Sequence, residues 1–189
     1  MDVFTLAGKV VEALEAEQVP YIVVGALSVS VFGIPRATKD VDIVISLQTR
    51  KPLDAVERRL ADVVEFDPQI TFETITGSLR HILHSRTSPP IVVELFELGA
   101  DPFVQSRFAR RRQEYSAQMQ RQAWLPTPED VIVQKLRWAR HKDLEDAGSV
   151  LAVRGTATLD MPYIEHWCAQ HGSLLKLHAV LDSIPPDLR

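Results

Sequence analysis

The chain has 189 residues, of which 46% are hydrophobic and 24% charged, and its formal net charge is −4 at pH 7. This balance is ordinary for a soluble globular protein, and the negative charge excludes a protein that binds nucleic acid over its whole surface. The single cysteine, Cys168, excludes an intramolecular disulfide and a multi-cysteine zinc site. A reducing, cytoplasmic location is therefore expected, and the mixed charges of residues 2–18 are unlike a signal peptide.

The first predicted elements surround an uncharged stretch. Residues 2–18 form an amphipathic helix by the spacing of their apolar side chains. Residues 18–35 carry no charge and are nominally long enough to span a membrane. Four helix-breaking or turn residues interrupt this stretch: Pro20, Gly25, Gly33 and Pro35. We therefore predict a strand over 21–24, a turn, a short helix over 26–32 and no membrane segment.

Two aspartates lie where the next strand, 41–45, begins. Asp40 and Asp42 project to the same side because strand side chains alternate. Neighbouring carboxylates are costly unless a cation lies between them, and oxygen ligands suit Mg²⁺ or Mn²⁺. Gly25 lets the backbone approach a ligand, and the following helix N-terminus attracts phosphate. An Asp-x-Asp pair can also be a solvated turn, but the strand, glycine, helix and strand context favours a metal and phosphate site.

This stretch resembles the nucleotidyltransferase superfamily, the polymerase-beta-like fold. Its signature is an apolar strand, Gly-Gly or Gly-Ser, and then Asp-h-Asp-h on the next strand, where h is apolar. The matching residues are Gly25, Ala26, Asp40, Val41, Asp42 and Ile43. The run Arg36-x-Thr38-x-Asp40-x-Asp42 is most similar to the AbiEii-like toxins and their uncharacterised relatives. The resemblance implies an α/β fold with a mixed sheet flanked by helices, and a nucleotide-binding role for Arg36 and Thr38.

The resemblance is incomplete at Ala26, where the family carries Gly or Ser. Ala26 offers no hydroxyl to phosphate, so Ser28 would substitute for it, or the backbone alone would hold the phosphate. Arg36 and Lys39 add positive charge beside the carboxylates, either for substrate phosphates or as simple charge balance.

A third acidic residue lies in a dense apolar strand. The elements predicted after the aspartates are a helix over 48–64, a hairpin over 70–75 and 79–85, and a strand over 91–96. Burying Glu94 in that last strand costs several kcal/mol unless it is paired or binds a metal. The superfamily has a third carboxylate in an h-Asp/Glu-h setting, which Val93-Glu94-Leu95 matches. Glu97 competes for this role, although solvent would satisfy it at the strand end.

The middle of the chain is locally basic. A helix over 103–112 and a small hairpin over 114–119 and 122–125 are predicted here. Between residues 105 and 122 five arginines stand against the single acid Glu114: Arg107, Arg110, Arg111, Arg112 and Arg121. They predict either a face that holds RNA or a triphosphate, or a solvated helix surface.

A clear helix start divides the chain. Thr127 has the features of an N-cap, Pro128 takes the first helical position, and Asp130 follows three residues after the cap. The later pattern is helical throughout, with helices predicted near 128–140, 144–153, 161–171 and 174–181. We therefore predict a catalytic domain over 1–125 and a C-terminal helical domain over 126–189.

Lys135 lies on or beside the apolar face of the first of these helices. It either snorkels to solvent or points into a cleft between domains. Residues 135–146 resemble the Lys-x-x-x-Arg-x-x-Lys-Asp-x-x-Asp pattern of AbiEii-like proteins. By that resemblance Lys135 contacts nucleotide phosphate, and Lys142, Asp143 and Asp146 border the site. The alternative is that Lys142 and Asp146 form a helix surface pair.

These features predict a metal-dependent nucleotidyltransferase that moves an NMP from an NTP, ATP included, to a hydroxyl acceptor. Asp40, Asp42 and Glu94 would hold two Mg²⁺ or Mn²⁺ ions, and Glu94 would help to take the acceptor proton. The acceptor would be RNA or tRNA, a protein or a small molecule, with a slight preference for RNA. Two alternatives stay open: a catalytically degenerate nucleotide-binding module, or a protein partner such as the toxin of a toxin-antitoxin pair. No nucleophile elbow or histidine metal spacing supports a hydrolase.

Overall fold

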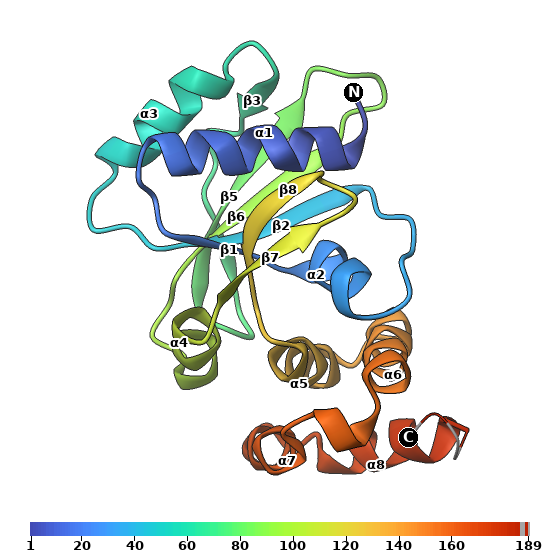
Figure 1. Ribbon diagram of the computed structural model, residues 1–189. Coiled ribbons are helices and arrows are strands. Elements are labelled where there is room, and N and C mark those ends of the chain that lie inside the picture. Colours follow the sequence, from blue (N-terminus) through green and yellow to red (C-terminus); the bar gives the residue numbers. More distant parts are fainter. Residues whose placement is uncertain (186–187, 189) are drawn as a thin grey trace. The chain divides into compact units, whose positions relative to one another are not determined.

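A mixed six-stranded sheet forms the centre of the first part of the chain (Figure 1). The computed structural model describes residues 1–185 and 188. They divide into two compact units, one of residues 1–27 and 37–125 and the other of residues 28–36 with the described residues from 126 on. The α/β fold with a mixed sheet, flanking helices and a C-terminal helical region is as predicted.

The strands of the main sheet run in the order β1, β2, β6, β5, β3, and β4 also pairs with β5. Only β2 and β6 pair in parallel; the other strands of this sheet pair antiparallel. The bounds are β1 (Tyr21–Val23), β2 (Asp40–Ile45), β3 (Val64–Phe66), β4 (Thr71–Glu73), β5 (Ser78–Ser85) and β6 (Val92–Glu97). The predicted hairpin is thus β4 and β5, with a shorter first strand than expected.

Helices α1 (Val3–Ala16) and α3 (Lys51–Leu60) pack together beside the sheet. Both bury an apolar stripe, and the alternate residues of β2 and β6 on the facing side are fully buried as well. These core residues are Leu6, Val10, Leu14, Leu53, Val56, Val41, Ile43, Ile45, Val93 and Leu95. Each such side chain stabilises the fold by about 1.5–3 kcal/mol through its removal from water.

The other side chains of β2 face a different environment. Val44 forms a small core with Ile22 of β1 and Phe108 of α4 (Pro102–Ala109), and Phe96 of β6 packs against it. Val44, Asp40 and Asp42 are alternate residues of β2, so their side chains lie on the same face of the sheet. One face of the sheet is therefore apolar under α4 and acidic toward the start of β2.

The predicted small hairpin is confirmed as β7 (Arg112–Ser116) and β8 (Arg121–Leu125). It contacts β1 through the Trp124 backbone N–H, which lies 3.4 Å from the Tyr21 hydroxyl. Arg121 binds Glu15 of α1 at 2.5 Å and the Gly8 carbonyl at 3.0 Å. These bonds hold the hairpin to the N-terminal helix.

The second unit is helical. It contains α5 (Pro128–Trp138), α6 (His141–Arg154), a short 3₁₀ turn (Thr156–Thr158), α7 (Met161–Gln170) and α8 (Leu174–Ser183). Thr127 caps α5 in a capping box with Asp130, as predicted. Tyr163 of α7 donates a 2.6 Å hydrogen bond to the same Asp130 carboxylate, which ties the two helices together. The four helices match those predicted to within a few residues.

One helix is shorter than the sequence predicts. The helix predicted over 48–64 begins at Lys51 and ends at Leu60, because the short strand β3 pairs with β5. A strand of three residues has too little alternation to be recognised in the sequence, so only its distant partner defines it.

Within the described residues no helix is long and apolar enough to cross a membrane.

Candidate active site

Three carboxylates share one face of the sheet. Asp40 and Asp42 are alternate residues of β2, and the parallel register places Asp42 beside Glu94 of β6. Neighbouring strands lie about 4.8 Å apart, so Asp42 and Glu94 are close neighbours on that face. All three side chains are partly exposed, while Val41 and Val93 on the other face are fully buried. This arrangement is open to a solvent-borne ligand.

Gly25 lies directly against Asp42. It joins β1 to α2 (Gly25–Phe32) with φ at +64°, a conformation that residues with a side chain adopt rarely. A Cβ atom on Gly25 would lie 2.0 Å from Asp42 Oδ2. The Val24 N–H donates a 2.9 Å hydrogen bond to the Asp42 carbonyl, and this bond holds the turn beside β2. The glycine therefore brings the start of α2 against the second aspartate.

Asp40 has a local partner on the connector that precedes β2. The Thr38 hydroxyl donates to Asp40 Oδ1 in a short hydrogen bond, which limits rotation of that carboxylate. Lys39, between them, is exposed. Thr38 thus has a positioning contact in the predicted site, and Lys39 keeps its ammonium in solvent.

Glu94 is paired with a residue that the sequence did not reveal. Arg80 of β5 donates from Nη1 to Glu94 Oε1 at 2.8 Å and from Nε to Thr71 Oγ1 at 2.8 Å. The register sets Ile82 opposite Glu94, so Arg80 reaches it diagonally on the same face. This partly buried carboxylate therefore has a cation partner. Alternation in 79–85 could have shown the face of Arg80, but only the register gives its neighbour.

Glu97, the competing third carboxylate, lies on the opposite face of β6 from Glu94. Its Oε1 is 2.7 Å from Nε2 of His81, whose side chain is buried. Side chains three residues apart on a strand point to opposite faces, so Glu97 is not part of the carboxylate group around Asp42.

A second charged cluster lies within the helical unit. Lys135 Nζ is 2.8 Å from Asp146 Oδ2 and 3.1 Å from Asp143 Oδ1. Arg36 donates two hydrogen bonds to the Asp146 carboxylate, from Nε at 2.7 Å and from Nη2 at 2.9 Å. Arg140 Nε donates to Asp143 Oδ2 at 2.6 Å. Lys135, Asp143 and Asp146 are each at most 4% exposed as side chains. Lys135 is thus ion-paired in the interior, and the expectation that it snorkels to solvent is wrong.

The net charge of this cluster favours ionised aspartates. Burial raises the pKa of Asp143, but the hydrogen bonds from Arg140 and the charge of Lys135 outweigh it, and the pKa is lowered from 3.8. The pKa of Asp146 is lowered in the same way, with burial opposed by the hydrogen bonds of Arg36 and Lys135. Both carboxylates are therefore anions at neutral pH.

The predicted nucleotide-binding residues thus fall into two groups. In the sheet unit Gly25, Thr38, Asp40, Asp42 and Glu94 come together, and Ala26 follows Gly25 at the start of α2. In the helical unit Arg36, Lys135 and Asp143 join the buried cluster, while Lys142 is exposed and Ser28 is buried within α2. The alternative pair of Lys142 with Asp146 is replaced by the bonds of Asp146 to Arg36 and Lys135.

The arginine-rich segment does not form a free basic face. Arg107 is buried, and Arg121 is paired with Glu15. The Arg111 guanidinium lies 4.2 Å from the centre of the Phe108 ring and 5.1 Å from that of Trp124. Burial lowers the pKa of Arg111. Most of the predicted positive charge is therefore used in packing, which removes the main argument for RNA.

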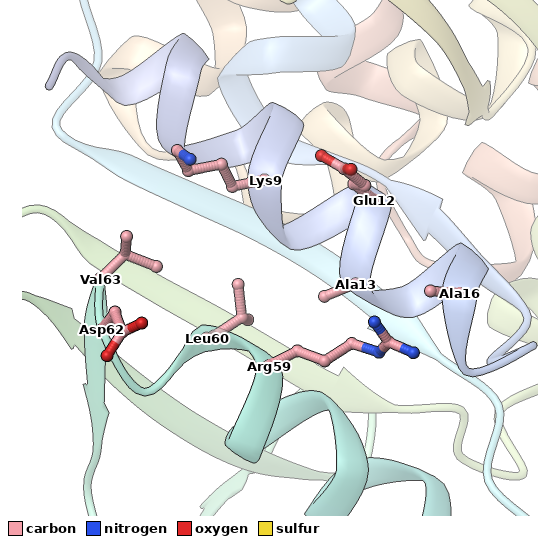
Figure 2. A pocket seen from close by; sticks show the side chains of 8 residues that line it. All are labelled: Lys9, Glu12, Ala13, Ala16, Arg59, Leu60, Asp62 and Val63. Atoms are coloured by element: carbon pink, nitrogen blue, oxygen red, sulfur yellow. The ribbon is translucent and has the colours of Figure 1, made fainter.

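A separate pocket of about 350 Å³ lies between α1 and α3 (Figure 2). Lys9 and Glu12 of α1 and Arg59 of α3 line it, with Asp62 beyond the end of α3. Arg59 is engaged by Glu17. None of the predicted site residues contributes to this pocket.

The donor chemistry of the carboxylate group fits Mg²⁺ or Mn²⁺, because these ions prefer oxygen ligands. The contact of Asp42 with Gly25 and the bond from Thr38 to Asp40 hold both aspartates on the same face. Over residues 1–185 and 188, however, no three histidine, cysteine or carboxylate side chains are gathered closely enough to hold one metal ion. The bond between Arg80 and Glu94 gives a physical reason, because it engages the third carboxylate.

Comparison with known proteins is consistent with this geometry. Residues 1–177 match the profile of a family described as "Nucleotidyltransferase of unknown function (DUF6036)". No curated protein matches the chain significantly.

Several solved structures share the fold. ANT(2'')-Ia in complex with adenylyl-2''-tobramycin is 15% identical, covers 90% of this chain and 97% of its own, and has a TM-score of 0.59. An antigenic nucleotidyltransferase-like protein from Paracoccidioides brasiliensis is 20% identical, with coverage of 96% and 92% and a TM-score of 0.56. JHP933 from Helicobacter pylori is 14% identical, with coverage of 95% and 89% and a TM-score of 0.53.

Proposed function

We propose that this chain, which belongs to the nucleotidyltransferase family DUF6036, transfers a nucleoside monophosphate from an NTP to an acceptor hydroxyl and releases pyrophosphate. One observation carries the proposal: the parallel register of β2 and β6 sets Asp40, Asp42 and Glu94 on one face, with Gly25 against Asp42. Carboxylates grouped beside a helix N-terminus suit a metal-bound polyphosphate.

Asp40 and Asp42 are the residues that would hold a divalent ion, and Glu94 would serve a second one. When bound, Mg²⁺ or Mn²⁺ supplies positive charge against the phosphates and the leaving pyrophosphate. Thr38 orients Asp40 through its hydroxyl. We assign to Glu94 the role of accepting the proton that the acceptor hydroxyl loses.

The start of α2 is proposed to orient the phosphates. This end of the helix is the positive end of its dipole, which attracts anions such as phosphate. Ala26 contributes no hydroxyl, and Ser28 is buried within the helix. We therefore assign phosphate binding here to the backbone, with Gly25 permitting close approach.

The roles that resemblance implies for the helical unit stay predictions. Phosphate contact by Lys135 requires its ammonium to leave Asp143 and Asp146, and phosphate contact by Arg36 requires loss of two bonds to Asp146. Lys142 is exposed and needs no such exchange. The division of work between a catalytic domain over 1–125 and an acceptor-selecting domain over 126–189 is part of this proposal.

A small-molecule acceptor is favoured over RNA. The arginines that argued for RNA are largely buried, stacked or paired. A protein of similar fold, ANT(2'')-Ia, has been solved with adenylyl-2''-tobramycin, in which an adenylyl group is joined to a small molecule. The placement near AbiEii-like toxins, and with it an antitoxin partner, rests only on the runs 36–42 and 135–146.

The test is thermal unfolding of the wild type and of Asp40→Ala/Asp42→Ala with each of the four NTPs, with and without Mg²⁺. A nucleotide at 100 times its Kd stabilises the folded chain by about 2.7 kcal/mol. We expect one or more NTPs to raise the Tm of the wild type only with Mg²⁺, and the double variant to lose this shift. Asp54→Ala, which removes an exposed carboxylate bound to Arg50, is the matched control.

Release of pyrophosphate in the presence of the stabilising NTP and a panel of aminoglycosides then tests transfer. Pyrophosphate that requires both Asp42 and an acceptor supports the transferase. Binding of an NTP without release under any acceptor supports the catalytically degenerate alternative instead.

A further inference from the structure

Arg80 is held at two points beside the carboxylate group. Its Nη1 donates to Glu94 Oε1 and its Nε to Thr71 Oγ1, both at 2.8 Å. The Thr71 hydroxyl in turn lies 3.4 Å from the Arg80 carbonyl. The side chains of Arg80 and Glu94 are 29% and 22% exposed, so this ion pair is partly shielded from water. An arginine fixed in this way has a defined position rather than a mobile surface charge.

Arg80 brings a positive charge to the carboxylate group. Asp40, Asp42 and Glu94 lie on one face of the sheet, and Arg80 pairs with Glu94. The bond to Arg80 uses Glu94 Oε1 and places a cation where a second metal ion would otherwise be attracted. A guanidinium and a divalent ion repel each other, so Glu94 cannot serve both equally.

We propose that Arg80 is a positioning residue that limits divalent-ion binding. While Arg80 holds Glu94, a metal ion binds through Asp40 and Asp42, and Glu94 becomes a metal ligand only when Arg80 is displaced. This inference rests on the proposed function. Phosphate oxygens are strong acceptors for guanidinium donors, so a bound polyphosphate is the group of the right chemistry to displace Arg80.

The test is Mn²⁺ binding without nucleotide, followed by electron paramagnetic resonance of the free ion. Arg80→Met removes the cation but keeps most of the side-chain length. We expect it to bind Mn²⁺ roughly tenfold more tightly than the wild type, because the positive charge beside Glu94 no longer repels the divalent ion. Damage to the fold alone would not raise metal affinity. Arg80→Lys, which keeps the charge, should restore wild-type affinity.

The double variant Arg80→Met/Glu94→Gln separates the proposal from a general charge effect at another carboxylate. With both charges removed, binding by Asp40 and Asp42 alone should return to the wild-type affinity. Weaker binding than wild type would mean that Glu94 is already a ligand, which overturns the proposal. Unchanged or weaker Mn²⁺ binding by Arg80→Met overturns it as well.

Two further variants control for folding and position. Arg50→Met removes an exposed arginine paired with a carboxylate on α3, and should leave Mn²⁺ affinity unchanged. If Arg80→Met does not fold, Thr71→Val loosens Arg80 without changing charge and should tighten Mn²⁺ binding by a smaller factor. No change in Thr71→Val would then count against the proposal.

The outcome is distinguishable from that of the proposed function because no nucleotide or acceptor is used. If no NTP stabilises the chain but Arg80→Met still tightens Mn²⁺ binding, the transferase assignment fails and this inference holds. If NTPs bind with Mg²⁺ but Arg80→Met leaves Mn²⁺ affinity unchanged, the reverse is true.

Discussion

Gly25 offers the sharpest test of how the site is built. In Gly25→Ala the new Cβ would lie 2.0 Å from Asp42 Oδ2 and 2.9 Å from Asp42 Cγ. The first distance is 1.4 Å short of the 3.4 Å at which ordinary contact begins, so the Asp42 carboxylate must move. We expect this variant to lose stability and to lose the stabilisation by Mg²⁺ and NTP, because Asp42 leaves its place beside α2.

The magnitude can be separated into two parts with a matched control. Gly77 has φ at +67°, close to the +64° of Gly25, but a Cβ there meets nothing within 4 Å. Gly77→Ala therefore measures only the left-handed backbone strain, about 1–2 kcal/mol for a residue with a Cβ. Gly25→Ala should lose a further about 1–3 kcal/mol, the usual effect of overpacking.

The assay is urea unfolding of both variants, combined with thermal unfolding with and without Mg²⁺ and NTP. In Gly25→Ala/Asp42→Ala the atoms that meet the new Cβ most closely are gone, so most of the additional loss should be recovered as a coupling energy. Equal stability of Gly25→Ala and Gly77→Ala, or a nucleotide shift that survives in Gly25→Ala, would refute the assigned contact.

Three predictions concern the remaining polar network. Lys135→Met should lower the free energy of unfolding by about 1.5–3 kcal/mol in urea, because Asp143 and Asp146 lose its bonds but each keeps one arginine partner. Since the folded pKa values of Asp143 and Asp146 lie below their ordinary value, the stability they add is present above about pH 4 and is lost as the pH falls through the lowered values; urea midpoints from pH 7 to 3 should show this loss. Tyr21→Phe removes the 2.7 Å bond to Glu15 and should lower the free energy of unfolding by about 1–2 kcal/mol.

Each of these has a control within the chain. Lys142→Met removes an exposed lysine of the same unit and should stay within about 0.5 kcal/mol of the wild type. Asp146→Asn should make the acid-side loss of stability shallower; an unchanged slope would contradict the role given to that carboxylate. Tyr115→Phe, at an exposed tyrosine of β7, should have little effect compared with Tyr21→Phe.

Much of the secondary structure could be predicted because its signals are local. The capping box of Thr127 and Asp130 and the alternation around Asp42 involve residues two or three apart, and the structure confirms the helix start and the strand. The strand β3 was missed because its three residues carry no periodicity and its partner lies in β5. The sequence left open whether the arginine-rich segment forms a basic face or a solvated helix surface, because composition cannot show that Arg107 is buried or that Arg121 meets Glu15.

The common face of Asp40 and Asp42, and the helix after Gly25, follow from the sequence alone, because pleat and turn geometry act between near neighbours. The place of Glu94 beside Asp42, its bond to Arg80 and the burial of Lys135 between two aspartates depend on the folded chain. Strand register and helix packing bring together residues distant along the chain. Whether a charged side chain binds a ligand or pairs with another side chain therefore depends on neighbours that lie far from it in the sequence.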